Sequence, residues 1–65
     1  MNAAKLRGVI AERGKTQNDV AIAIGITPRT FYAKMKSGHF GVDEAEKMVK
    51  YLDIQNPADI FLTSP

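Results

Sequence analysis

Two amphipathic stretches separated by one glycine constrain the fold more than any other feature of this sequence. They lie within residues 17–36 and leave room for a turn of only three or four residues around Gly25. So short a turn sets two helices at a steep angle, and they then approach closely at one small residue, Ala21. Gly25 can adopt the positive φ that costs other residues about 1–2 kcal/mol, and Ile26 supplies an apolar plug between the helices and the core. The spacing predicts two helices packed across a tight turn.

Helix-start and helix-stop signals divide the chain into five short predicted helices. Two starts carry a polar cap followed by proline, which is well tolerated at the first helical position. A third start has a threonine with an acid three residues later, a variant of the capping box. No segment alternates with the period of two that strands require, so we expect an all-α fold. The helices are expected from the Asn2 cap to Gly14, between Thr16 and Gly25, from about Thr27 to Ser37, from around Val42, and after Asn56.

Apolar residues recur at helical spacing through all five segments. Methionine and phenylalanine in such a pattern are far more often core than ligand pocket. The pattern predicts a core made of Leu6, Val9, Ile10, Val20, Ile24, Ile26, Phe31, Met35, Phe40, Ala45, Met48, Val49, Leu52, Ile54, Ile60 and Phe61.

The composition argues against catalysis and against metal or cofactor binding. The chain has no cysteine, and its one histidine, His39, has no carboxylates at ligand spacing. The acids of residues 43–46 fall at a predicted helix start, where the positive end of the helix dipole stabilises negative side chains. No glycine-rich loop could cradle a phosphate. We therefore expect no enzyme, no catalytic residues, no metal site and no cofactor.

The chain also lacks the features of a membrane or secreted protein. Its longest apolar stretch, residues 20–26, is far too short to cross a bilayer. No charged segment followed by an apolar block opens the chain, so no signal peptide is predicted. Sixty-five residues are enough for one domain, and we expect a single domain over residues 1–65 in a cytoplasmic protein.

The net charge of +2 is unevenly distributed. Residues 1–42 carry seven basic and two acidic side chains, a net +5, whereas residues 43–65 carry two basic and five acidic ones, a net −3. Two interpretations remain at this point. The charges either belong to an ordinary solvated surface or form a cationic face for a polyanion with an acidic far side.

The motifs resemble those of one known family. The run Lys15-Thr16-Gln17-Asn18-Asp19-Val20-Ala21, followed by Gly25-Ile26-Thr27, resembles the Cro/repressor helix-turn-helix family. Short repressor-like proteins of phages and prophages are similar over essentially the whole chain, with counterparts of Lys5 to Gly8, Lys34-Met35 and Ile60-Phe61. The resemblance implies a compact five-helix domain that binds an operator.

The sequence departs from the family at one place. The family has an apolar residue three positions after Phe31 and an acidic residue next, whereas this chain has Lys34 and Met35. The apolar face therefore steps by four, which predicts a third helix that is rotated or one residue longer than in better-known repressors.

The resemblance implies that the third helix, about Thr27–Ser37, lies in the major groove of DNA. The positions that read bases would be Pro28, Arg29 and Ala33, with Thr30 and Tyr32 adjacent. Pro28 has no side-chain donor, so one of the family's usual base contacts is absent. Arginine can donate to both O6 and N7 of guanine, and alanine can contact a thymine methyl group. The alternative is that Arg29 and Tyr32 are ordinary surface residues of an exposed helix.

Contacts to the DNA backbone are expected on both sides of this helix. Lysine is a flexible point charge that suits phosphate better than base readout. Gln17 and Asn18 lie at the amino end of the second predicted helix, where free N–H groups favour a phosphate. The alternative for Gln17 is a simple first-turn residue, and for the lysines it is a solvated surface. The expected backbone contacts are Gln17, Asn18, Lys15, Lys34, Lys36, Ser37 and Thr27.

The sequence therefore predicts a sequence-specific regulator that binds double-stranded DNA, a Cro-like repressor of a phage or prophage associated with the nucleoid. The alternatives are a protein-interaction module with the same fold and an accessory phage factor without operator-specific repression. An interaction module would expose apolar residues on the third helix. The apolar run Ile60-Phe61-Leu62 predicts a weak homodimer that forms more strongly on DNA, with Phe61 packed on the first and fourth helices and Ile60 or Leu62 partly exposed.

Overall fold

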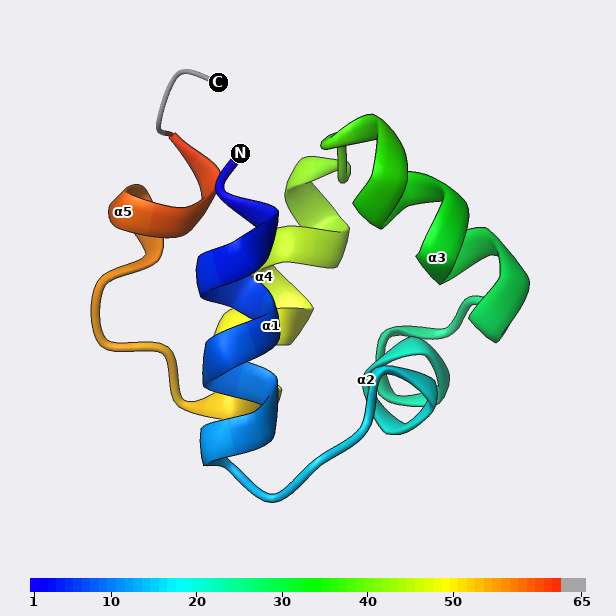
Figure 1. Ribbon diagram of the computed structural model, residues 1–65, viewed down its shortest axis with the longest axis horizontal. Helices are drawn as coiled ribbons and strands as arrows, with labels where there is room; N and C mark the ends of the chain where they lie inside the picture. The colour runs from blue at the N-terminus through cyan, green and yellow to red at the C-terminus, as the bar shows by residue number, and fades with distance from the viewer. Residues whose placement is uncertain (63–65) are drawn as a thin grey trace.

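The computed structural model describes residues 1–62, which form five helices and no strand (Figure 1). The predicted all-α fold is confirmed for this part of the chain. Residues 63–65 of the predicted domain lie outside the described residues. In chain order the helices are α1 (Ala3–Glu12), α2 (Gln17–Ile24), α3 (Pro28–Ser37), α4 (Val42–Leu52) and α5 (Pro57–Phe61).

Three helices start at the caps that the sequence predicts. Asn2 Oδ1 accepts a hydrogen bond from the Lys5 N–H over 3.0 Å at the start of α1. At α2 the capping box is complete, because Thr16 Oγ1 accepts from the Asp19 N–H over 3.1 Å and Asp19 Oδ2 accepts from the Thr16 N–H over 2.8 Å. Thr27 caps α3 with its hydroxyl alone, which accepts from the Thr30 N–H over 3.2 Å ahead of the proline at the first helical position.

The side-chain cap predicted at Asn56 is wrong. Helix α5 begins after it at Pro57, but no hydrogen bond from the Asn56 side chain caps the helix. The Asn56 backbone lies at φ −127° and ψ 67°, outside the extended conformation typical of a cap. The Asn56 carbonyl oxygen, rather than its side chain, accepts from the Asp59 N–H over 3.1 Å.

The carboxyl ends of α2 and α4 are closed in different ways. Gly25 ends α2 at φ +85°, the left-handed conformation predicted for it. Helix α4 ends at Asp53, a residue other than glycine at φ +51°. The Arg13 guanidinium covers that end, since Nε donates to the Leu52 carbonyl over 2.7 Å and a terminal nitrogen donates to that of Asp53 over 3.0 Å. Arg13 thus caps a helix 39 residues further along the chain.

The core lies where α2 meets its neighbours. Helix α2 packs against α3 and α4, and α1 packs against α2 and α5. The Asn2 N–H donates to the Ile60 carbonyl over 2.7 Å, which ties the start of the chain to α5. Figure 1 shows the result, with α3 at one edge of the molecule and α5 at the opposite edge. The buried apolar residues are Leu6, Ile10, Val20, Ala21, Ile24, Phe31, Met35, Met48, Leu52, Ile54 and Ile60.

Six residues predicted for the core are only half-buried. Four of them line an open groove described below, so one side of each remains accessible. Ala21, the small residue expected where the two helices of the motif approach closely, is fully buried. The half-buried residues are Val9, Ile26, Phe40, Ala45, Val49 and Phe61.

Candidate nucleic-acid interface

Helix α3 has one buried face and one exposed face. Phe31 and Met35, four residues apart as the sequence predicts, are its buried residues. The exposed face repeats at intervals of three and four residues, the spacing of one side of a helix. Its members are Arg29, Tyr32, Ala33 and Lys36.

The two cations of this exposed face are available to a partner. Within residues 1–62, no hydrogen bond or ion pair engages the side chain of Arg29 or Lys36. Ala33 lies between them on the same face and presents only a methyl group. The face therefore offers one guanidinium, one ammonium and a flat apolar position, and α3 lies at the edge of the molecule in Figure 1.

The two threonines at the start of α3 are hydrogen-bonded to each other. Thr27 Oγ1 accepts from the Thr30 N–H over 3.2 Å and donates to Thr30 Oγ1 over 2.9 Å. Both side chains are exposed. The cap fixes the first turn of α3, and Arg29 projects from that turn.

Tyr32 and Asn18, predicted from different helices, are brought together by the fold. The Tyr32 hydroxyl donates to Asn18 Oδ1 over 3.2 Å. Tyr32 remains 48% exposed. The bond joins the exposed surfaces of α3 and α2, so the two helices present one continuous face.

The amino end of α2 has free backbone donors. Gln17 is half-buried at the first helical position, and exposed Asn18 follows it. The cap uses the Asp19 N–H, whereas no hydrogen bond engages the N–H groups of Gln17 and Asn18 in the described part of the chain. The Thr16 backbone N–H, and then its hydroxyl, hold the pKa of Asp19 below its ordinary value. A carboxylate therefore lies beside these free donors.

Two lysines predicted to contact phosphate have partners within the protein. Lys15 Nζ lies 5.5 Å from the centroid of the Tyr51 ring, a cation–π contact with α4. Lys34 Nζ lies 2.8 Å and 2.7 Å from the two carboxylate oxygens of Glu44. Glu44 is an exception to the expected acidic far side, because it pairs with a cation of α3. Glu44 Oε1 also accepts the Gly41 N–H over 2.9 Å. The spacing of three residues is a local signal for this second bond, but it does not indicate the contact with Lys34.

Ser37 is exposed in the last turn of α3. Its hydroxyl donates to the Lys34 carbonyl over 3.0 Å, which leaves the oxygen lone pairs free to accept. His39 is exposed in the loop that follows, as expected for a loop residue.

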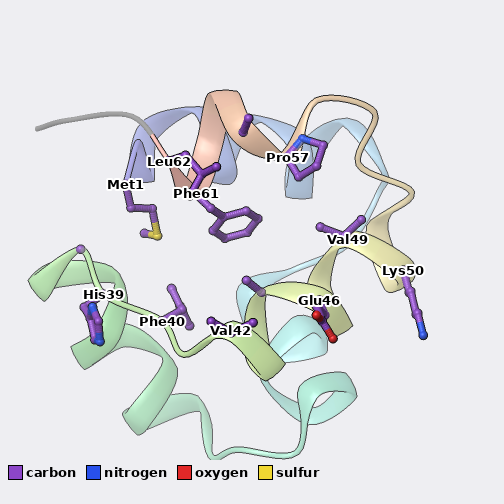
Figure 2. A pocket seen from close by; sticks show the side chains of 13 residues that line it. Met1, His39, Phe40, Val42, Glu46, Val49, Lys50, Pro57, Phe61 and Leu62 are labelled. Atoms are coloured by element: carbon purple, nitrogen blue, oxygen red, sulfur yellow. The ribbon is translucent and has the colours of Figure 1, made fainter.

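An apolar groove of about 680 Å³ opens between α4, α5 and the loop before α4 (Figure 2). Figure 2 shows the Phe61 ring directed into it. The lining includes two strongly exposed apolar side chains, Val42 at 75% and Leu62 at 82%. The expectation that Ile60 or Leu62 is exposed is met by Leu62, whereas Ile60 is buried.

Neither a metal-ligand cluster nor a membrane-spanning helix is found among the described residues. Nowhere in residues 1–62 do three or more histidine, cysteine, aspartate or glutamate side chains gather as metal ligands. None of the five helices combines the length and apolar character that spanning a bilayer requires.

Comparison with known proteins gives one match. The model of a family described as "Cro/C1-type HTH DNA-binding domain" matches residues 5–65. No curated protein and no solved structure matches the chain.

Proposed function

The chain belongs to the Cro/C1-type helix-turn-helix DNA-binding domain family, and on that premise we propose that it is a sequence-specific regulator of transcription. In this proposal a single domain binds duplex DNA with α3 in the major groove, and the protein acts as a Cro-like repressor of a phage or prophage. The observation that carries it is the exposed face of α3, where Arg29, Ala33 and Lys36 follow helical spacing with no partner among the described residues.

The proposed base contacts come from the first two turns of that face. Arg29 projects from the first turn of α3 and can donate to O6 and N7 of one guanine. Ala33, one turn later, can pack on a thymine methyl group. Thr30 and Tyr32 flank these two positions and would contact the neighbouring bases or sugars.

The proposed backbone contacts surround the base contacts. Lys36 and Ser37 lie at the carboxyl end of α3, and Gln17 and Asn18 offer free N–H groups at the amino end of α2. Thr27 and Lys15 are peripheral members, because each already has an intramolecular contact. Such contacts fix the register of the protein on DNA and carry no sequence information directly.

The alternative of a protein-interaction module is less well supported. Such a module would present apolar residues on α3, yet that face carries two cations, Arg29 and Lys36, on either side of Tyr32 and Ala33. The strongly exposed apolar residues lie on other elements, at Ile22, Val42 and Leu62. An accessory phage factor would use the same DNA interface, and a repression assay with a reporter gene separates it from a repressor.

We also propose that a second copy of the chain covers the apolar groove when the protein is bound to DNA. Leu62 and Val42 would contribute apolar contacts, and Glu46 and Lys50, which also line the groove, have opposite charges that two copies can exchange. One groove with so few exposed apolar side chains supports only weak association. Sedimentation should therefore show that the free protein is mostly monomeric and that two copies bind each selected DNA site. The variant Leu62→Ser should reduce this pairing on DNA, whereas the control Ile22→Ser should not. A tight dimer at nanomolar concentration, or one copy per site, contradicts this part of the proposal.

Selection of binding sites from random duplex DNA tests the proposed function. The expected result is an enriched motif whose binding weakens as salt increases. Equal recovery of all sequences at every round would contradict sequence-specific binding. Absence of any duplex binding at low salt would contradict the DNA-binding role.

A further inference from the structure

The side chain of Lys34 is fixed by a carboxylate on the next helix. Its Nζ lies within 2.8 Å of both oxygens of Glu44. Glu44 is held a third time, since Oε1 accepts the Gly41 N–H over 2.9 Å. The carboxylate is therefore tied to the backbone of Gly41, just before α4, and would lose this bond if it followed Lys34 away.

The surroundings strengthen this ion pair. The side chains of Lys34 and Glu44 are only 34% and 17% exposed, and partly buried pairs are screened by salt less than exposed ones. The hydrogen bond from Lys34, and then that from the Gly41 N–H, hold the pKa of Glu44 below its ordinary value. Glu44 is therefore ionised at neutral pH.

Lys34 differs in this respect from the other lysine of α3. Lys36 is exposed and has no partner within residues 1–62, whereas Lys34 would have to leave Glu44 before it could reach a phosphate. Leaving would strand a largely shielded carboxylate, which is costly. Glu44 of α4 thus occupies one of the two lysines of α3, and Lys36 is the lysine of that helix left without a partner in the described residues.

We infer that Glu44 limits sequence-independent DNA binding by holding Lys34 away from the phosphate backbone. This inference rests on the proposed DNA-binding function. Each phosphate neutralised by a cation steepens the dependence of log affinity on log salt by about 0.9 for duplex DNA. Releasing Lys34 should therefore add one phosphate contact on DNA of any sequence.

The variant Glu44→Gln removes the charge and keeps an amide oxygen that can still accept the Gly41 N–H. For non-specific duplex DNA we expect its salt slope to be steeper than that of the wild type by about 0.9. Between about 50 mM and about 200 mM salt, the variant should then lose roughly 3.5-fold more affinity than the wild type. The double variant Glu44→Gln/Lys34→Ala should return to the wild-type slope.

Two further variants isolate the cause. Asp43→Asn removes a neighbouring exposed acid of α4 and the same amount of charge, and we expect it to leave the slope unchanged. Lys34→Ala keeps the bond between Glu44 and Gly41, so it tests the same inference if Glu44→Gln folds poorly. We expect its slope to equal that of the wild type.

Three results would overturn the inference. They are an unchanged slope in Glu44→Gln, an equal increase in Asp43→Asn, and a slope about 0.9 shallower in Lys34→Ala, which would mean that Lys34 already contacts phosphate. The wild-type slope is measured first. A wild type that binds no duplex DNA defeats the proposed function itself, whereas a binding wild type with these variant results defeats only the role of Glu44.

Discussion

The Tyr32 hydroxyl of α3 donates a hydrogen bond to Asn18 Oδ1 of α2 over 3.2 Å. Both residues are exposed, so the bond does not belong to the core. It connects the surface that we propose for base reading with the surface that we propose for a phosphate clamp. The two helices of the motif are thereby held in register on this proposed DNA-binding side.

Tyr32→Phe removes this bond and preserves the ring. A single hydrogen bond contributes about 0.5–1.5 kcal/mol net, and we expect a loss of that order in operator affinity. The free energy of unfolding, measured with urea, should change by less than about 1 kcal/mol because the bond is exposed. Tyr51→Phe on α4 is the matched control and should bind normally. Equal affinity of wild type and Tyr32→Phe for operator DNA would show that the bond plays no part in binding.

Arg29→Ala tests base readout. We expect a loss of about 1–3 kcal/mol on a selected site and little change on non-specific DNA, because a bidentate contact to guanine discriminates between bases. Fluorescence anisotropy titrations with both DNAs measure the two affinities. An equal loss on both would make Arg29 a backbone contact.

Lys36→Ala tests the phosphate contacts of α3. Removing one contact should lower the salt slope by about 0.9 on any duplex. Arg7→Ala, which removes an exposed cation of α1, serves as the control and should leave the slope unchanged. Identical slopes for Lys36→Ala and the wild type would leave Lys36 as a solvated surface residue.

Two glycines test the conformational requirement of the turn. No atom lies within 4 Å of a Cβ built at Gly25 or at Gly8, but Gly25 is at φ +85° whereas Gly8 lies within α1. Gly25→Ala should therefore destabilise the protein by about 1–2 kcal/mol through backbone strain alone. Gly8→Ala should stabilise it by about 0.5–1 kcal/mol, since alanine favours a helix. Chemical denaturation measures both, and the same sign for the two variants would contradict this reading of the turn.

Acid should weaken the tie between α3 and α4. The folded pKa of Glu44 lies below its ordinary value of 4.5, which we take for the unfolded chain. The unfolded state therefore binds the proton more readily, so the contribution of Glu44 is fully present above 4.5 and is lost as the pH falls through the folded pKa. Urea unfolding of the wild type and Glu44→Gln should differ at pH 7 and converge in acid. A difference that stays constant through the acid range would contradict this assignment.

Local signals predicted most of the helix boundaries. The caps at Asn2, Thr16 and Thr27 and the left-handed Gly25 each depend on residues within one turn, which a sequence displays directly. The buried face of α3 also followed from a local spacing of four residues. The cap predicted at Asn56 is wrong because its backbone lies outside the extended conformation, and its carbonyl oxygen rather than its side chain accepts the Asp59 N–H.

Contacts between residues far apart in the chain could not be predicted from the sequence. Arg13 reads as one more position of the α1 pattern, and nothing local indicates that its guanidinium closes the end of α4. Lys34 and Glu44 each looked like surface charges until the fold placed them together. The apolar groove likewise depends on how α4 and α5 are packed. A single sequence displays periodicity and caps, whereas these features depend on tertiary geometry.

Methylation protection on a selected site measures the central claim most directly, which is that α3 lies in the major groove. Dimethyl sulfate modifies guanine at N7, an atom of the major groove. We expect saturating protein to protect guanines in two clusters about 34–36 Å apart along the duplex. Saturating Arg29→Ala should leave one guanine of each cluster reactive. Protection confined to adenine N3 of the minor groove, or guanine protection that Arg29→Ala does not alter, would contradict the account.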